Sequence, residues 1–123
     1  MAIEQLIAEQ QEETREIVEA LLEDGSVRDA TYTIEHHFAS ADFDALEKVA
    51  VDVFKAGFQV EDAEEVELDD GAIVFCFDAV IEHELDIDRL DKDCETLIRI
   101  AEKHDVLYDG WGTYFVESEE QIQ

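Results

Sequence analysis

The sequence predicts an α+β protein with an antiparallel sheet, on the basis of two periodicities and one turn. Three segments carry apolar residues at helical spacing, and they begin at Met1, near Asp42 and near Asp86. Between them lie segments in which apolar residues recur at every second position or run almost without interruption, as in strands. An Asp-Gly pair, Asp70-Gly71, separates two of these strand-like segments and is typical of a hairpin. A chain of 123 residues with this mixture predicts one domain.

The first segment, residues 1–25, predicts a long amphipathic helix that ends near Gly25. Its apolar face consists of Ile3, Leu6, Ile7, Ile17, Val18, Leu21 and Leu22. Gln10, Gln11 and Thr14 make the middle of that face polar. The pattern does not decide whether this helix covers the sheet or packs at its edge.

A half-buried strand and a second helix follow. Alternation over Thr31–Phe38 places Tyr32, Ile34, His36 and Phe38 on one face. Ser40 or Asp42 can then cap a helix, and Gly57 stands where that helix would end. The apolar positions between them have helical spacing: Phe43, Leu46, Val49, Ala50, Val53 and Phe54.

The segments Phe58–Leu68 and Ala72–Ile81 are predicted to form a hairpin around Asp69-Asp70-Gly71, because glycine tolerates the positive φ of such a turn. The second segment is almost wholly apolar, which is typical of a central strand. Its core face is expected to be Ile73, Phe75, Phe77 and Ile81.

A third helix is predicted to begin at Asp86 or Asp88, with Leu90, Cys94, Leu97, Ile98 and Ala101 along one side. A last strand over Val106–Val116 is interrupted by Gly110 and Gly112. After the first helix, the order is therefore β-α-β-β-α-β. This order predicts a ferredoxin-like core at residues 28–116, with two helices on one face of a four-stranded antiparallel sheet. Residues 117–123 are expected to form an acidic tail.

The charge of the chain limits its partners. Thirty-five Asp and Glu residues against eight Lys and Arg give a net charge of −27, which opposes binding to nucleic acid and to anionic membranes and favours a basic protein surface. The first segment lacks the features of a signal peptide, and no apolar run approaches the length of a membrane span. We therefore expect a cytoplasmic protein. Cys76 and Cys94 are expected to be buried apolar residues without a disulfide.

No group of residues predicts catalysis or a cofactor. Glu35 and Asp78 are the carboxylates worth weighing because both lie within strands, but a sheet-surface role is favoured for them. Adjacent residues of a strand project to opposite faces, so His36 and His37 are not expected to bind one metal ion. The glycines around Trp111 are followed by no lysine or helix start, so tight strand geometry explains them better than phosphate binding.

Four stretches of the chain resemble the bacterial family of ribonuclease E inhibitor protein B (RraB). They are EETREIVEALLEDGS, YTIEHHF, LEKVAVDVFKAGFQV and AEKHDVLYDGWGTYF, of which TIEHH and YDGWGTYF are the most specific. The resemblance implies a ferredoxin-like fold, binding to the C-terminal scaffold region of ribonuclease E, and inhibition of RNA cleavage with an altered RNA degradosome. The family-motif residues, whose role is unknown, lie in YTIEHHF and YDGWGTYF and include Tyr32, Glu35, His36, His37, Asp109, Gly110, Trp111, Gly112 and Tyr114.

A charge argument alone selects the partner-binding residues. The densest acidic segment contains Glu61, Asp62, Glu64, Glu65, Glu67, Asp69 and Asp70, and Glu82 and Glu84 continue it. Carboxylates of this kind can pair with arginines of a basic, RNA-binding partner. The alternatives are a general nucleic-acid mimic, an adaptation to high salt, and a carboxylate-based enzyme. Family members can continue into a longer acidic tail, and if that tail contributes to binding, a chain that stops at Gln123 is expected to bind more weakly.

Overall fold

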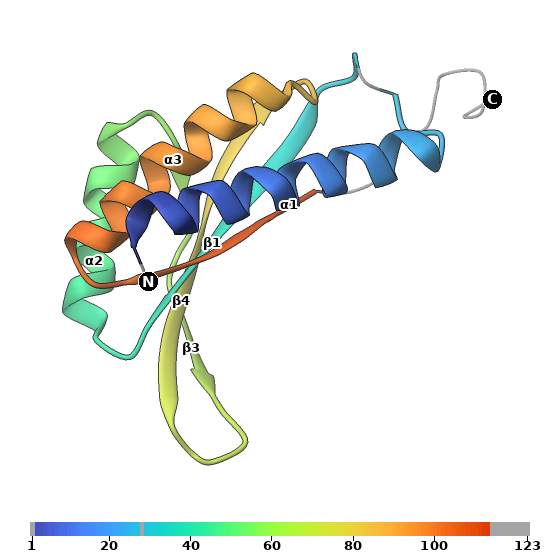
Figure 1. Cartoon of the computed structure of the whole chain (residues 1–123). Coiled ribbons are helices and arrows are strands. Elements are labelled where there is room, and N and C mark those ends of the chain that lie inside the picture. Colours follow the sequence, from blue (N-terminus) through green and yellow to red (C-terminus); the bar gives the residue numbers. More distant parts are fainter. Residues whose placement is uncertain (1, 28, 114–123) are drawn as a thin grey trace.

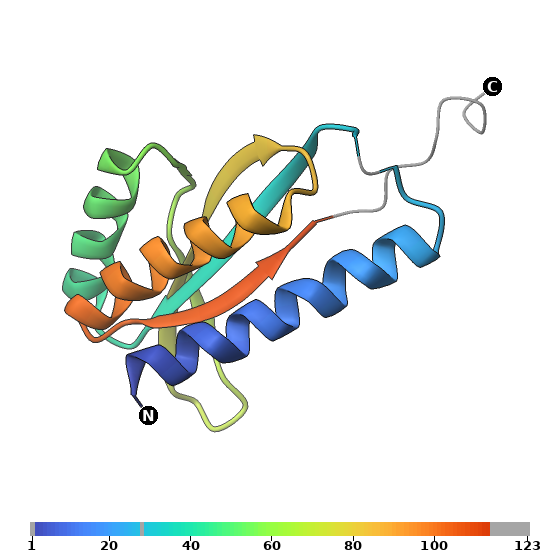
Figure 2. The ribbon, with the colours of Figure 1, turned by 45° about the horizontal axis from the view of Figure 1, so that its top comes forward.

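The computed structural model describes residues 2–27 and 29–113, which form an α+β structure with three helices and a five-stranded antiparallel sheet (Figure 1). The helices lie along one face of the sheet (Figure 2). In chain order the elements are α1 (Ile3–Glu23), β1 (Tyr32–Ser40), α2 (Phe43–Lys55), β2 (Gln59–Val60), β3 (Glu64–Glu67), β4 (Ile73–His83), α3 (Ile87–Lys103) and β5 (Leu107–Gly112). Within the two described ranges, no helix combines the length and apolar character needed to cross a membrane.

Side-chain caps fix the starts of α2 and α3 and decide between the two candidates that the sequence offered for each. The carboxylate of Asp42 accepts a hydrogen bond from the backbone N–H of Ala45 at 3.3 Å. The carboxylate of Asp86 accepts from the N–H groups of Asp88 and Arg89. Each cap satisfies a backbone donor that the first helical turn leaves without an intrahelical acceptor.

The sheet has the order β2-β4-β1-β5, and β3 also pairs with β4. The prediction of four strands is therefore wrong by one, because the predicted strand 58–68 is divided into β2 and β3. Residues 61–63 leave the ladder, although the N–H of Glu61 still donates to the carbonyl of Asp78 at 2.9 Å. Glu, Asp and Ala are poor strand formers, which accounts for the break. The ferredoxin-like topology stays a prediction.

The core lies between the helices and the inner face of the sheet. The expected alternation on β1 is confirmed, since Tyr32, Ile34, His36 and Phe38 are all buried. Leu46, Val49 and Val53 of α2, and Leu90, Cys94, Leu97, Ile98 and Ala101 of α3, cover them.

Two predictions about β4 are wrong in part. Phe77 is buried in the core, but Ile73 is 41% exposed because the β3–β4 hairpin extends past the helices (Figure 1). Cys76 is half-buried on the opposite face of the sheet, whereas Cys94 is buried as expected, and both thiols are free. None of the described helices covers this opposite face, which is called the open face below.

The helix α1 packs at the edge of the sheet rather than across its open face. It runs beside α3 and along β5, on the same side of the sheet as α3 (Figure 2). Its residue Val18 packs against Tyr32 and Trp111 in the core. The edge alternative left by the sequence is therefore the one that the structure has.

Candidate protein-binding surfaces

The two most specific sequence motifs meet in the sheet, because β1 and β5 are adjacent antiparallel strands. Glu35 pairs with Gly112, His36 with Trp111, and Phe38 with Tyr108. The residues TIEHH and YDGWG therefore form one structural unit, although they are far apart in the sequence. The side chains of this unit divide between the buried and the open face.

A bulge in β5 explains the glycine within YDGWG. Tyr108 and Trp111 are three residues apart, so a regular strand would turn them to opposite faces. Their partners on β1, Phe38 and His36, are only two apart, and the ladder is irregular between them. Gly110 absorbs the extra residue with φ +87°, a left-handed conformation that glycine adopts at little cost. Tyr108 and Trp111 therefore both face the core.

The buried side of the motif unit holds a short polar network. Nδ1 of His36 lies 2.8 Å from the hydroxyl of Tyr108, and that hydroxyl lies 3.3 Å from Sγ of Cys94. Burial, with a smaller effect of His83 and His37, lowers the pKa of His36 to about 3. Burial also raises the pKa of Cys94 to about 11 and that of Tyr108 well above its usual value. All three groups are therefore neutral near pH 7 and act as structural hydrogen-bonding groups.

Two motif aromatics connect α1 to the sheet. Nε1 of Trp111 donates to the hydroxyl of Thr14 at 3.0 Å, and both residues are buried. The hydroxyl of Tyr32 donates to the carbonyl of Val27 and lies 2.6 Å from Oγ of Ser26, just after α1. The polar middle of the α1 face is the sequence signal of this contact. These polar residues of α1 were visible in the sequence, but the buried indole of Trp111 that bonds to one of them was not.

The open side of the motif unit carries a hydrogen bond between a histidine and a carboxylate. Nδ1 of His37 lies 2.8 Å from Oδ1 of Asp78, and both side chains are more than a third exposed. Gly112 lies alongside, since a Cβ at this position would be 3.7 Å from Nε2 of His37. Glu35 is half-buried on the same face. Within the described ranges, no three His, Cys, Asp or Glu side chains are close enough to hold a metal ion.

The acidic segment predicted from charge is an exposed hairpin arm. All residues from Glu61 to Asp70, called the acidic arm below, are exposed. The arm projects beyond the helices (Figure 1). Its turn is confirmed: Gly71 has φ +86°, and the N–H of Leu68 donates to the carbonyl of Ala72 at 2.7 Å.

At the base of the acidic arm is a hollow of about 170 Å³. It is lined by Glu61, Asp62, Glu64, Cys76, Phe77 and Asp78. Four of these six side chains are carboxylates, so the hollow suits a cationic group.

The other predicted acidic residues lie elsewhere. Glu64 pairs with Cys76 near one end of β4, whereas Glu82 stands near the other end, opposite Thr33. Glu82 lies six positions further along the strand than Cys76, a distance of about 20 Å. The structure therefore gathers the seven acids of the arm but places Glu82 and Glu84 apart from them. Tyr114 lies outside the described residues.

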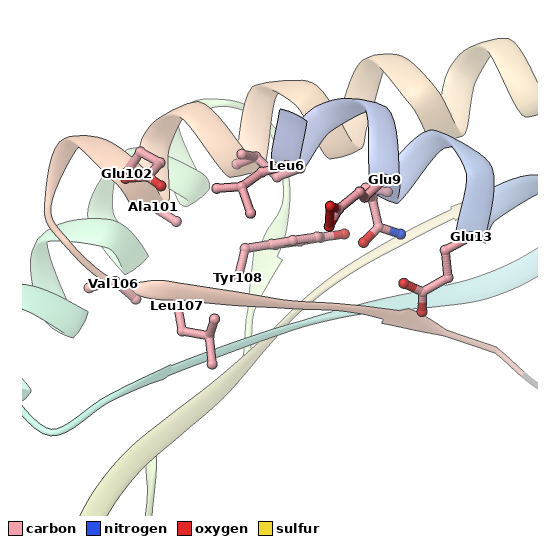
Figure 3. A pocket seen from close by; sticks show the side chains of 10 residues that line it. Leu6, Glu9, Glu13, Ala101, Glu102, Val106, Leu107 and Tyr108 are labelled. Carbon is pink, nitrogen blue, oxygen red and sulfur yellow. The ribbon is translucent and has the colours of Figure 1, made fainter. Parts of the chain in front are cut away.

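The sequence reasoning missed a cavity of about 180 Å³ between α1, α3 and β5 (Figure 3). It depends on the docked position of α1, which no local pattern reveals. Its walls combine apolar side chains, Tyr108 and three glutamates: Glu9, Glu13 and Glu102.

Comparison with known proteins identifies the family. The family model described as "Regulator of ribonuclease activity B" matches residues 11–113, which include TIEHH, YDGWG and the acidic arm. The chain belongs to this family. The family name describes a regulator of ribonuclease activity and not a catalyst.

Three relatives with the same name show how far the similarity extends. The protein from Shewanella amazonensis is 62% identical over 122 residues, which cover 99% of this chain and 86% of the relative. The protein from Alteromonas mediterranea is 67% identical over 106 residues, or 86% of this chain and 80% of the relative. The protein from Aeromonas salmonicida is 63% identical over 105 residues, or 85% of this chain and 91% of the relative.

Proposed function

We propose that this protein is a non-catalytic inhibitor of ribonuclease E. It binds the basic C-terminal scaffold region of the enzyme in the cytoplasm, and it thereby changes endonucleolytic activity, degradosome composition and RNA abundance. The observation that carries the proposal is the match of residues 11–113 to a family named for the regulation of ribonuclease activity.

The acidic arm supports a basic protein partner. None of its seven carboxylates takes part in an ion pair within the described ranges, so their charge is available to a partner, although Asp70 also accepts a hydrogen bond from the N–H of Ala72 in the turn. Carboxylates attract the same arginine and lysine side chains that bind phosphate groups, and complementary charge accelerates association. The same charge repels nucleic acid and anionic lipid, so neither is proposed as a direct partner.

We propose that the part of the chain that carries this arm is a ferredoxin-like core at residues 28–116. The strand order β2-β4-β1-β5 supports it, since β2 and β3 together take the place of one interrupted strand beside β4. The broken strand leaves the arm at the edge of the sheet, where its side chains are exposed.

A pulldown of purified ribonuclease E fragments over a series of salt concentrations tests the function. We expect the scaffold fragment to be captured at low salt and released as salt rises, because exposed charges are screened. Capture of no fragment at low salt would contradict the proposal. Equal capture of unrelated basic proteins, each displaced by RNA, would favour the general nucleic-acid mimic instead.

A charge-reversal variant tests the acidic arm itself. The variant Glu61→Lys, Asp62→Lys, Glu64→Lys and Glu65→Lys should slow association with the scaffold fragment, because charges at the edge of an interface chiefly govern the on-rate. The matched control reverses four exposed acids of α1: Glu4, Glu12, Glu16 and Glu19. Both variants change the net charge equally. Equal on-rates for the two variants would show that total charge, and not the arm, directs association.

A further inference from the structure

We infer that the cavity between α1, α3 and β5 is a second contact site, which receives an arginine side chain of the ribonuclease partner. This inference rests on the proposed function. The cavity lies beside β5, at the edge of the sheet opposite the acidic arm. Its volume of about 180 Å³ leaves room for about six water molecules, or for one long side chain.

The interior of the cavity suits the hydrocarbon part of such a side chain. Leu6 of α1, Ile98 of α3 and Val106 before β5 supply its apolar surface. The ring of Tyr108 extends from β5 beneath α1, toward Leu6 and Glu9 (Figure 3). Arginine buries its methylene stem against apolar surface, and its guanidinium stacks favourably on an aromatic ring.

The mouth of the cavity carries negative charge that no basic residue of the described chain offsets. Glu9 and Glu13 are exposed and one helical turn apart, so they repel each other. Glu102 adds a third exposed carboxylate from α3. The nearby cations are bound elsewhere: Arg15 pairs with Asp91 at 3.0 Å, and Lys103 with Asp52 at 3.6 Å.

An amide oxygen in the cavity wall offers an acceptor to a hydrogen-bond donor of the partner. Gln10 lines the cavity and is only 7% exposed. Its amide nitrogen donates to Thr14 at 3.5 Å, but its amide oxygen accepts no hydrogen bond from the described residues. This oxygen lies 3.8 Å from the position of a Cβ on Gly110, which places it toward β5. This oxygen is not sealed from solvent, so a guanidinium N–H of the partner would replace water as its donor.

These features select arginine among the possible cations. The three carboxylates do not form a cluster that could hold a metal ion within the described ranges. A guanidinium has five donors in a rigid plane, so it can reach carboxylates on two elements and the amide oxygen at once. Lysine presents a compact and strongly hydrated charge, which matches this spread of acceptors less well.

NMR titration of the full chain with short peptides tests the site directly. We expect acetyl-Gly-Arg-Gly-amide to shift the amide signals of residues 6–13 and 106–110, whereas the neutral citrulline peptide leaves them unchanged. Shifts confined to other residues would overturn the site. An equal response to the lysine peptide or to spermidine would overturn the assignment to arginine.

Two triple variants connect the cavity to the ribonuclease. Glu9→Gln, Glu13→Gln and Glu102→Gln should weaken binding of the ribonuclease E scaffold fragment about tenfold, as the loss of three partly exposed ion pairs implies. The control, Glu12→Gln, Glu16→Gln and Glu19→Gln, has the same net charge and should bind within about twofold of the unaltered chain. Equal weakening by the two variants would overturn the inference. Failure of the unaltered chain to bind any fragment would instead contradict the proposed function.

Discussion

Burial of His36 predicts that acid destabilises the fold by an amount that can be calculated. Its pKa is about 3 in the folded protein, against about 6.5 in an unfolded chain. Between these pH values the unfolded state binds a proton that the native state does not. The contribution of His36 to the free energy of unfolding is therefore complete above pH 6.5 and is lost as the pH falls. From pH 8 to pH 5, this linkage removes about 2 kcal/mol of unfolding free energy. His36 is fully buried, so solvent screening does not reduce the effect.

A comparison of the unaltered chain with the variant His36→Gln isolates this effect, because the titration of the 35 acidic residues is common to both proteins. Urea unfolding at pH 8 and pH 5 gives the change in free energy for each, and the unaltered chain should lose about 2 kcal/mol more than the variant. NMR of the imidazole gives a second readout, since His36 should not titrate between pH 8 and pH 5. Equal losses in the two proteins, or a His36 midpoint near 6.5, would refute the reasoning.

Three further predictions concern the docking of α1, the β5 bulge and the thiols. Thr14→Val leaves the buried indole N–H of Trp111 without its acceptor and should lower the free energy of unfolding, measured with urea, by about 1–3 kcal/mol. Thr14→Ser keeps a hydroxyl and should lower it less. Equal stability of the two variants would contradict the hydrogen bond. Gly110→Ala places a side chain at φ +87° and should cost roughly 1–2 kcal/mol more than Gly112→Ala, which thermal unfolding can compare. A thiol reagent should modify half-buried Cys76 in the native protein but Cys94 only after unfolding, as peptide mass spectrometry can establish.

The elements that could be predicted from the sequence depend on local interactions. The caps at Asp42 and Asp86 and the turn at Gly71 satisfy backbone groups within a few residues, so the sequence pattern contains them. The alternation on β1 also persists, because a helical layer buries one of its faces and leaves the other open.

The features that could not be predicted depend on contacts between distant segments. The sequence offered two positions for α1, and its hydrogen bond from Trp111 to Thr14 decides between them. The bulge at Gly110 appears only when β5 is aligned with β1, because Tyr108 and Trp111 must both reach the core. The cavity is formed by three elements together, and no single one of them indicates it.

The residues that distinguish the family motifs and the residues that carry unpaired charge are different sets, and the structure gives them different roles. His36 and Trp111 are buried and hold the sheet and α1 together, so substitutions there should reduce stability before they affect binding. The glutamates of the arm and of the cavity are exposed and contribute little to the core, so their neutralisation should reduce binding with the fold intact. Because the arm and the cavity lie at opposite edges of the sheet, one basic partner that reached both would gain affinity from two linked contacts. Neutralising both surfaces in one protein should then weaken binding by more than the product of the separate effects, since after the loss of one contact the other still holds the partner, and after the loss of both none does.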